Sequence, residues 1–203
     1  MKNIFLFGRP GCGKSVVFRK INELLNKRSP AVKFDRIDDF PILKEMHEGD
    51  EASGRTDRFV STDDGGFKII DPNVWDEMLV GLNKKAERYQ KKNGILAIEF
   101  SRPNYLHALT LFSANILKNS VAIYVDASFD TCITRNEERT KRAVEEGIDA
   151  HFVSKKEMEE TYKDDDREAL KTASPVPVFI IDNGDCATLT DIEKLLRPIV
   201  EKL

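Results

Sequence analysis

A stretch of eight residues near the N-terminus has the types and spacing of a phosphate-binding loop. Gly8-Arg9-Pro10-Gly11-Cys12-Gly13-Lys14-Ser15 fits the pattern GxxxxGK followed by Ser or Thr. Its glycines allow the backbone to wrap closely around an anion, with the N–H groups pointing inward. Lys14 is expected to reach the β- and γ-phosphates of ATP, and the Ser15 hydroxyl is expected to bind Mg²⁺.

The context of this loop supports the same interpretation. It directly follows a short apolar run, Ile4–Phe7, and it opens a segment with helical spacing, so that a helix N-terminus adds partial positive charge. Lys14 is expected to act in catalysis as well as in binding. The residues expected to contact the nucleotide are Gly8, Gly11, Cys12, Gly13, Lys14, Ser15 and Val16.

Acidic side chains end two further apolar runs. Asp38 and Asp39 follow the second run, and Glu99 follows the third. A carboxylate beside a transferred phosphoryl group can orient the attacking hydroxyl, and an acid at the position of Glu99 typically holds Mg²⁺ or serves as a base. We therefore expect Asp38 and Glu99 to be catalytic, Glu99 to share the metal with Ser15, and Asp39 to contact the acceptor. Which of the three acids is the base stays open, and Asp-Asp-Phe-Pro is also typical of a turn that caps a helix.

Several arginines could stabilise or bind phosphate groups. Arg135, Arg139 and Arg142 recur at i, i+4 and i+7 on one helical face, where Arg135 and Arg139 are the expected catalytic pair. Arg102, three residues after Glu99, could bind an acceptor phosphate with two hydrogen bonds, and Arg58 is the other expected acceptor-binding arginine. The alternative for each is a solvated surface side chain.

Alternating short apolar runs and amphipathic segments must position these residues. Strands are expected at 4–7, 31–37, 95–98, 121–125 and 176–181. Helices are expected at 14–26, from 71–72 to 89, and at 105–117, 129–146, 155–162 and 189–200. Phe59-Val60 and residues 67–70 are expected to pair as a hairpin across a glycine turn.

This alternation predicts an α/β fold with three layers, in which a parallel sheet is covered by helices on both faces. In such sheets the chemistry lies beyond the carboxyl ends of the strands, and each polar cluster described above follows a strand. We expect one domain over residues 1–203, with an acceptor-side insertion at 48–70 and a lid region at 136–165.

The loop and these clusters resemble the small P-loop kinases of the nucleoside monophosphate kinase-like (adenylate kinase-like) group. The resemblance implies a P-loop NTPase fold with a five-stranded parallel sheet of order 2-3-1-4-5, ATP on the loop, a lid of arginines, and an acceptor above the second and third strands. It also implies that an acid such as Asp38 accepts the hydroxyl proton or helps to hold the metal. Glu99-Phe100-Ser101-Arg102 is similar to the acid-plus-arginine cluster of these kinases, although its spacing matches neither their nucleotide-kinase nor their deoxynucleoside-kinase form.

Composition excludes several other classes. The net charge is −3, which argues against a nucleic-acid coat or a binder of anionic membranes. No apolar stretch approaches the roughly 20 residues that span a bilayer, and no signal peptide is expected. Three widely spaced cysteines form neither a disulfide framework nor a metal knuckle, so we expect a cytoplasmic protein. Its oligomeric state stays open between a monomer and a homodimer.

The sequence therefore predicts an ATP- and Mg²⁺-dependent phosphotransferase that acts on a nucleoside, a nucleotide or a similar small acceptor. A kinase of a non-nucleotide acceptor and a regulatory nucleotide-binding protein with little turnover stay open. A GTP-binding switch is disfavoured. Asp63-Asp64-Gly65-Gly66 has the DxxG shape, but Asn83-Lys84-Lys85-Ala86 lacks the aspartate of a guanine-reading NKxD motif.

Overall fold

The computed structural model describes residues 2–62, 66–146 and 153–203. Its five longer strands form a parallel sheet in the order β2-β5-β1-β6-β7. Counted along the chain without the separate hairpin, this order is 2-3-1-4-5, as the resemblance implied. The sheet strands are β1 (Lys2–Phe7), β2 (Phe34–Asp38), β5 (Ile95–Glu99), β6 (Ser120–Asp126) and β7 (Val178–Asp182).

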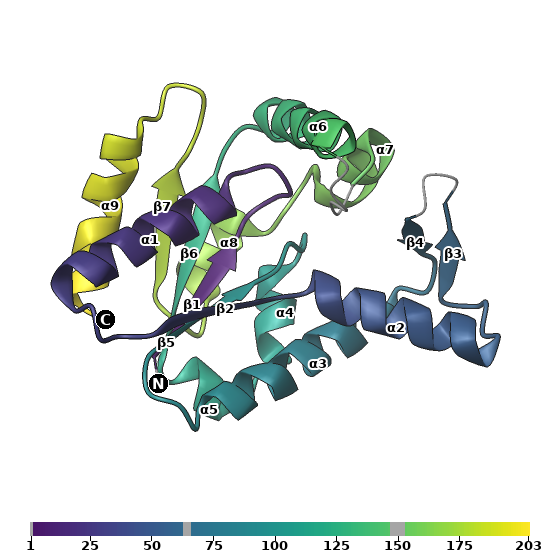
Figure 1. The fold of residues 1–203 in the computed structure, drawn as a ribbon, viewed down its shortest axis with the longest axis horizontal. Helices are drawn as coiled ribbons and strands as arrows, with labels where there is room; N and C mark the ends of the chain where they lie inside the picture. Colours follow the sequence, from purple (N-terminus) through teal and green to yellow (C-terminus); the bar gives the residue numbers. More distant parts are fainter. Residues whose placement is uncertain (1, 63–65, 147–152) are drawn as a thin grey trace.

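Helices cover both faces of this sheet, because its central strands are apolar on both sides. On one face lie α1 (Lys14–Arg28) and α9 (Leu189–Glu201), whose buried side chains share a core with Ile4 and Leu6. On the other face lie α3 (Asn73–Tyr89), α4 (Tyr105–Thr110), α5 (Ala114–Leu117) and α8 (Arg167–Ala173), which share a second core with Phe5 and Phe7. The three-layer α/β expectation is confirmed (Figure 1).

The segment after β2 contains a helix that the sequence did not predict. Helix α2 (Phe40–Ser53) begins after Asp39 with a proline in its first turn and ends at Gly54, whose φ of 71° suits a helix C-terminus. The expected hairpin is confirmed as β3 (Phe59–Ser61) paired with β4 (Phe67–Ile69). It packs on α2 through aromatic rings, and the ring centroids of His47 and Phe67 are 4.5 Å apart.

Two other helix predictions were incomplete. A single helix over 105–117 was wrong, because Ser113 takes an extended conformation between α4 and α5, where its N–H donates to Asn83 Oδ1 at 3.1 Å. The short helix α8 was not predicted. In the lid region, α6 (Phe129–Glu146) is followed by α7 (Lys155–Glu157) and a π-helix, η1 (Met158–Tyr162). Among the described residues, no helix is at once long and apolar enough to cross a membrane.

Candidate active site

A pocket of about 430 Å³ lies beyond the carboxyl ends of β1, β2 and β5. The phosphate-binding loop forms one wall of the pocket. Most residues that the sequence selected line it: Gly11, Gly13, Lys14, Ser15, Asp38, Asp39, Glu99, Arg102, Arg135 and Arg139. The topology brings them together because the carboxyl ends of neighbouring parallel strands meet at one edge of the sheet.

The loop has a backbone that only glycine adopts without strain. Gly8, Gly11 and Gly13 have φ angles of 131°, 82° and 99°. A Cβ atom on Gly11 would lie 2.2 Å from the carbonyl oxygen of Cys132, and one on Gly13 would lie 2.1 Å from Asn183 Nδ2. A side chain at either position would therefore force the loop or its neighbours to move.

Lys14 is buried inside the loop rather than extended into solvent. Its Nζ donates to the carbonyl oxygens of Gly8 at 2.8 Å and Arg9 at 3.1 Å, and to Ser101 Oγ at 2.8 Å. Ser101 Oγ in turn donates to the Gly8 carbonyl at 2.9 Å. Sequence reasoning did not select Ser101, because a serine two residues after Glu99 carries no motif of its own.

The three acids occupy adjacent strand ends. Asp38 on β2 pairs with Glu99 on β5 in the register of the sheet, and Asp39 follows directly. Burial raises the pKa of the Glu99 carboxyl above its usual range, although Lys14 and Arg36 oppose the shift. Burial, and then the charge of Asp39, raise the pKa of Asp38. Asp39 begins α2 without a side-chain capping bond, so its carboxylate is directed to other partners.

Arg36 lies among these groups and was not predicted. It precedes Asp38 by two residues, which puts both side chains on the same side of β2. Its Nε lies 3.0 Å from Glu99 Oε2 and 4.0 Å from Asp38 Oδ2, and its Nη1 lies 3.4 Å from Ser15 Oγ. The two-residue period of a strand was the signal in the sequence that could have found it.

The donor set fits Mg²⁺ bound together with a nucleotide. Ser15, Asp38 and Glu99 supply hard oxygen ligands beside the loop, and Glu99 Oε2 is buried with no hydrogen-bond partner in the described part of the chain. The described residues contain no group of three or more His, Cys, Asp or Glu side chains that could hold a metal alone. Magnesium rarely needs such a cage, since it usually keeps several waters and binds through one or two carboxylates and the substrate phosphates.

Two of the three arginines that the sequence selected on α6 reach the pocket. Arg135 and Arg139 line it, whereas Arg142 is exposed further along α6. Arg135 Nη1 donates to the carbonyl oxygen of Asn183 at 2.8 Å, and Arg139 Nη2 donates to Asn136 Oδ1 at 2.7 Å. Both partners of these arginines are neighbours of the loop, because Asn183 Nδ2 donates to the Cys12 carbonyl at 2.7 Å and a Cβ on Gly11 would lie 3.3 Å from the Asn136 nitrogen.

The other end of the pocket is lined by aromatic side chains and one buried arginine. The guanidinium carbon of Arg102 lies 4.0 Å from the centre of the Trp75 ring, and Arg102 Nη2 lies 3.6 Å from Asp39 Oδ2. Arg102 is 6% exposed, and its Nε has no hydrogen-bond partner among the described residues. The remaining lining side chains here are Phe40, Leu43, Phe67, Ile69, Phe100, Glu157 and Tyr162.

The aromatic residues at this end were outside the sequence prediction for the site. Trp75 belongs to the apolar stripe of α3 and lines the pocket from there. Glu157 and Tyr162 come from the lid region, and burial raises the pKa of the Glu157 carboxyl. No local motif marks such residues, because only the packing of α2, α3, the hairpin and η1 brings them to one cavity.

The structure places Arg58, the other arginine expected to bind the acceptor, outside this pocket. It does not line the pocket, because its guanidinium pairs with Asp50 through both Nε and Nη2 and with Glu77 through Nη1 at 2.6 Å. It therefore joins the end of α2 to α3.

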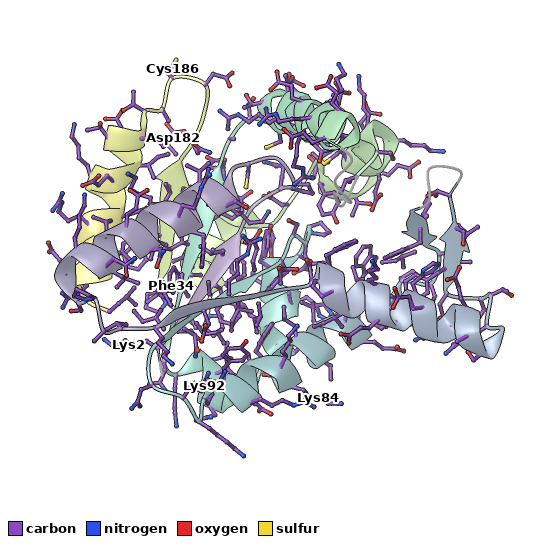
Figure 2. The ribbon with its side chains drawn as sticks, in the orientation of Figure 1. Lys2, Phe34, Lys84, Lys92, Asp182 and Cys186 are labelled. Atoms are coloured by element: carbon purple, nitrogen blue, oxygen red, sulfur yellow. The ribbon has the colours of Figure 1, made fainter. Side chains whose placement is uncertain are left out.

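Three of the loop residues expected to contact the nucleotide are not part of the pocket lining. Gly8, Cys12 and Val16 do not line the pocket, and the Cys12 side chain is buried beneath the loop. The third cysteine, Cys186, is exposed in the turn between β7 and α9 (Figure 2). The DxxG-shaped segment falls mostly at 63–65, outside the described residues.

No protein-family model matches this chain, and no curated protein matches it. Solved structures do. Kti12 of Chaetomium thermophilum in complex with ADP-AlF3 is 14% identical, with a TM-score of 0.61 over 98% of this chain and 97% of that one. A gluconokinase from Sinorhizobium meliloti is 13% identical, with a TM-score of 0.57 over 99% and 92%. The Mycobacterium tuberculosis APS kinase, in complex with AMPPNP and APS, is 14% identical, with a TM-score of 0.55 over 98% and 97%. The chain therefore has the fold of the P-loop kinases.

Proposed function

We propose that this protein is a small-molecule kinase that transfers the γ-phosphate of ATP, with Mg²⁺, to a nucleoside, a nucleotide or a similar small acceptor. One observation carries the proposal. The phosphate loop, three strand-end acids and the Trp75–Arg102 pair line the same pocket. A donor site and an acceptor site thus share one cavity, as direct phosphoryl transfer requires. We further propose that the chain belongs to the nucleoside monophosphate kinase-like group, on the basis of its sheet order and its lid arginines.

On the donor side, the loop amides between Gly8 and Ser15 would bind the β- and γ-phosphates. Lys14 already points into the loop, and an arriving phosphate would exchange with the carbonyl oxygens of Gly8 and Arg9 as its partner. Arg135 and Arg139 would stabilise the charge that develops on the moving phosphoryl group. Mg²⁺, held by Ser15 and Glu99, would neutralise phosphate charge and orient the oxygens.

On the acceptor side, Asp38 is the better candidate for the base. Its side chain is 32% exposed and faces the pocket, whereas the Glu99 side chain is 11% exposed and lies beside Arg36. The raised pKa of Asp38 helps a carboxylate to accept a proton from a hydroxyl as the phosphoryl group leaves ATP. Asp38 would thus hold the acceptor hydroxyl in line with the γ-phosphate.

The aromatic end of the pocket favours a flat acceptor with an anionic group. Phe40, Phe67 and Trp75 line this end, and Arg102 offers a buried guanidinium whose Nε has no hydrogen-bond partner in the described part of the chain. Asp39 opposite Arg102 keeps this cation oriented in the free protein. A phosphate or a carboxylate on the acceptor would complete the hydrogen bonds that Arg102 lacks.

The test is a transfer assay with γ-labelled ATP and Mg²⁺ against nucleosides, nucleoside monophosphates, sugars and hydroxy acids. We expect a labelled product in the nucleoside or nucleotide group. Lys14→Ala should abolish transfer, and Lys27→Ala, on the exposed end of the same helix, should not. Arg102→Ala should raise KM for an anionic acceptor by at least about tenfold while KM for ATP stays unchanged.

Two other results would redirect the assignment. A labelled sugar or hydroxy acid would replace the nucleoside or nucleotide acceptor with a non-nucleotide one. Tight ATP binding with only slow hydrolysis against the whole panel would contradict the kinase proposal and favour a regulatory nucleotide-binding protein.

A further inference from the structure

Arg36 lies beside Ser15 and Glu99, which the proposed function assigns to magnesium, and near the proposed base Asp38. Its guanidinium lies 3.4 Å from Ser15 Oγ, 3.0 Å from Glu99 Oε2 and 4.0 Å from Asp38 Oδ2. The strand pattern produces this position. Arg36 and Asp38 point to one side of β2, Glu99 stands beside Asp38 on β5, and Ser15 opens α1 above them.

The contacts of Arg36 with these oxygen atoms are mainly electrostatic, because their hydrogen-bond geometry is poor. Within the described residues Glu99 Oε2 accepts no hydrogen bond, although the Arg36 Nε atom lies 3.0 Å away, and the Ser15 contact is at the long limit of a hydrogen bond. The Arg36 side chain is 30% exposed and lies over the Phe18 ring at 5.6 Å from its centre. Lys14, in contrast, is buried and donates three hydrogen bonds.

Arg36 and a metal cannot use these oxygens together. A magnesium ligand lies about 2.1 Å from the ion, so a metal on Ser15 Oγ would face the guanidinium across a short gap. Two cations at such a distance repel each other, and the repulsion is strong where one acid is buried. Because the Arg36 side chain has open solvent on one side, it can leave the site without unpacking the core.

We propose that Arg36 is a built-in counter-ion that holds Ser15, Asp38 and Glu99 while no metal is bound, and that it is displaced by the magnesium of the nucleotide complex. This inference rests on the proposed function. It has a thermodynamic consequence. Arg36 supports nucleotide binding without metal and competes with metal binding, so it reduces the factor by which Mg²⁺ strengthens nucleotide affinity.

The experiment measures that factor directly. Isothermal titration calorimetry gives the Kd of ADP in saturating Mg²⁺ and in EDTA. The Kd in EDTA divided by the Kd in Mg²⁺ is the factor by which Mg²⁺ strengthens ADP binding. Arg36→Gln should raise this ratio at least about fivefold over the wild type. Arg36→Lys, which keeps the charge with a smaller head group, should give a ratio nearer the wild type. Arg19→Gln, which removes an exposed arginine from α1, should leave it unchanged.

The possible results distinguish the role of Arg36 from the proposed function. A ratio in Arg36→Gln that equals the wild-type ratio, or falls below it, overturns the role of Arg36. A wild-type protein that binds ADP in neither condition overturns the proposed function instead. A crystal structure of the wild type with ADP and Mg²⁺ provides a second test that needs no variant. We expect the guanidinium to have moved away from Ser15 Oγ, and a guanidinium still beside a bound metal would contradict the inference.

Discussion

Lys14 Nζ and Ser101 Oγ lie 2.8 Å apart, and both groups donate to the carbonyl oxygen of Gly8. The end of β5 is thereby fastened to the phosphate loop after β1. Ser101 Oγ bonds to both the lysine and the backbone of the loop. It therefore holds the loop and the end of β5 at a fixed separation.

Ser101→Ala should therefore destabilise the protein. The substitution removes two buried hydrogen bonds and should lower the free energy of unfolding by about 1–2 kcal/mol, which is a fall in Tm of about 4 °C. Ser113→Ala is the matched control, because Ser113 Oγ is buried without a hydrogen-bond partner among the described residues. Thermal unfolding followed by circular dichroism measures both variants. Equal Tm values for the two would contradict the role given to Ser101.

Glu99→Gln should stabilise the protein while it impairs transfer. Burial raises the folded-state pKa of Glu99, so the protonated carboxyl contributes stability that is lost as the pH rises through that pKa. Glutamine keeps the neutral form at every pH, and Tm at pH 7 should rise by about 2–4 °C. The difference from the wild type should vanish below about pH 4, where the wild-type carboxyl is protonated in both states.

The control for this prediction is Glu48→Gln, at an exposed position on α2, which should change neither Tm nor transfer. Phosphate transfer by Glu99→Gln should fall at least about a hundredfold if this acid holds the metal or serves as the base. A lower Tm at pH 7 in Glu99→Gln would show that ionised Glu99 stabilises the fold and would refute the prediction.

Gly11→Ala should weaken ADP binding at least about tenfold, because the added Cβ would meet the Cys132 carbonyl oxygen at 2.2 Å and displace the loop. Gly54→Ala is matched to it. Gly54 has a similar φ of 71°, but a Cβ there meets nothing within 4 Å. That variant should show only the backbone strain, about 1–2 kcal/mol of stability, with the wild-type affinity for ADP. Calorimetry and thermal unfolding separate the two effects.

Arg58→Ala should lower Tm without changing KM for the acceptor, since Arg58 pairs with Asp50 and Glu77 rather than lining the pocket. The hydrogen bond from Arg58 lowers the pKa of Asp50, so this stability is present at neutral pH and is lost as the pH falls through the folded-state pKa of Asp50. Arg55→Ala, whose partner Asp57 is exposed, should have little effect. If KM for the acceptor rises in Arg58→Ala and not in Arg55→Ala, Arg58 does bind the acceptor and this prediction is wrong.

Local patterns were sufficient for the layered fold and for the loop from Gly8 to Ser15. The loop from Gly8 to Ser15 carries its own geometry, since glycine spacing and a following helix depend on neighbours in the chain. Apolar runs fixed the sheet strands, and the acids at their ends were found because strand ends are recognisable locally. Helix α2 was missed because its polar second half lacks a continuous apolar stripe, and part of its packing is with the hairpin, as in the ring contact between His47 and Phe67.

Residues that act through distant partners could not be found in this way. In the sequence, the polar neighbours of Arg58 do not distinguish it from a substrate-binding arginine. Only the fold shows that Asp50 and Glu77 pair with it and keep it out of the pocket. Trp75 was assigned to a helix stripe, yet the packing of α3 beside β5 turns it toward Arg102.

The sequence by itself determined the phosphate loop, the alternation of strands and helices, and the acids that end β2 and β5, because each depends on residues within a few positions of one another. Only the tertiary structure decided which arginines enter the pocket, that Ser101 fastens Lys14, and that Arg36 stands among the acids. These contacts join residues 21 to 87 positions apart, and their geometry follows from strand register and helix packing, which no local spacing encodes.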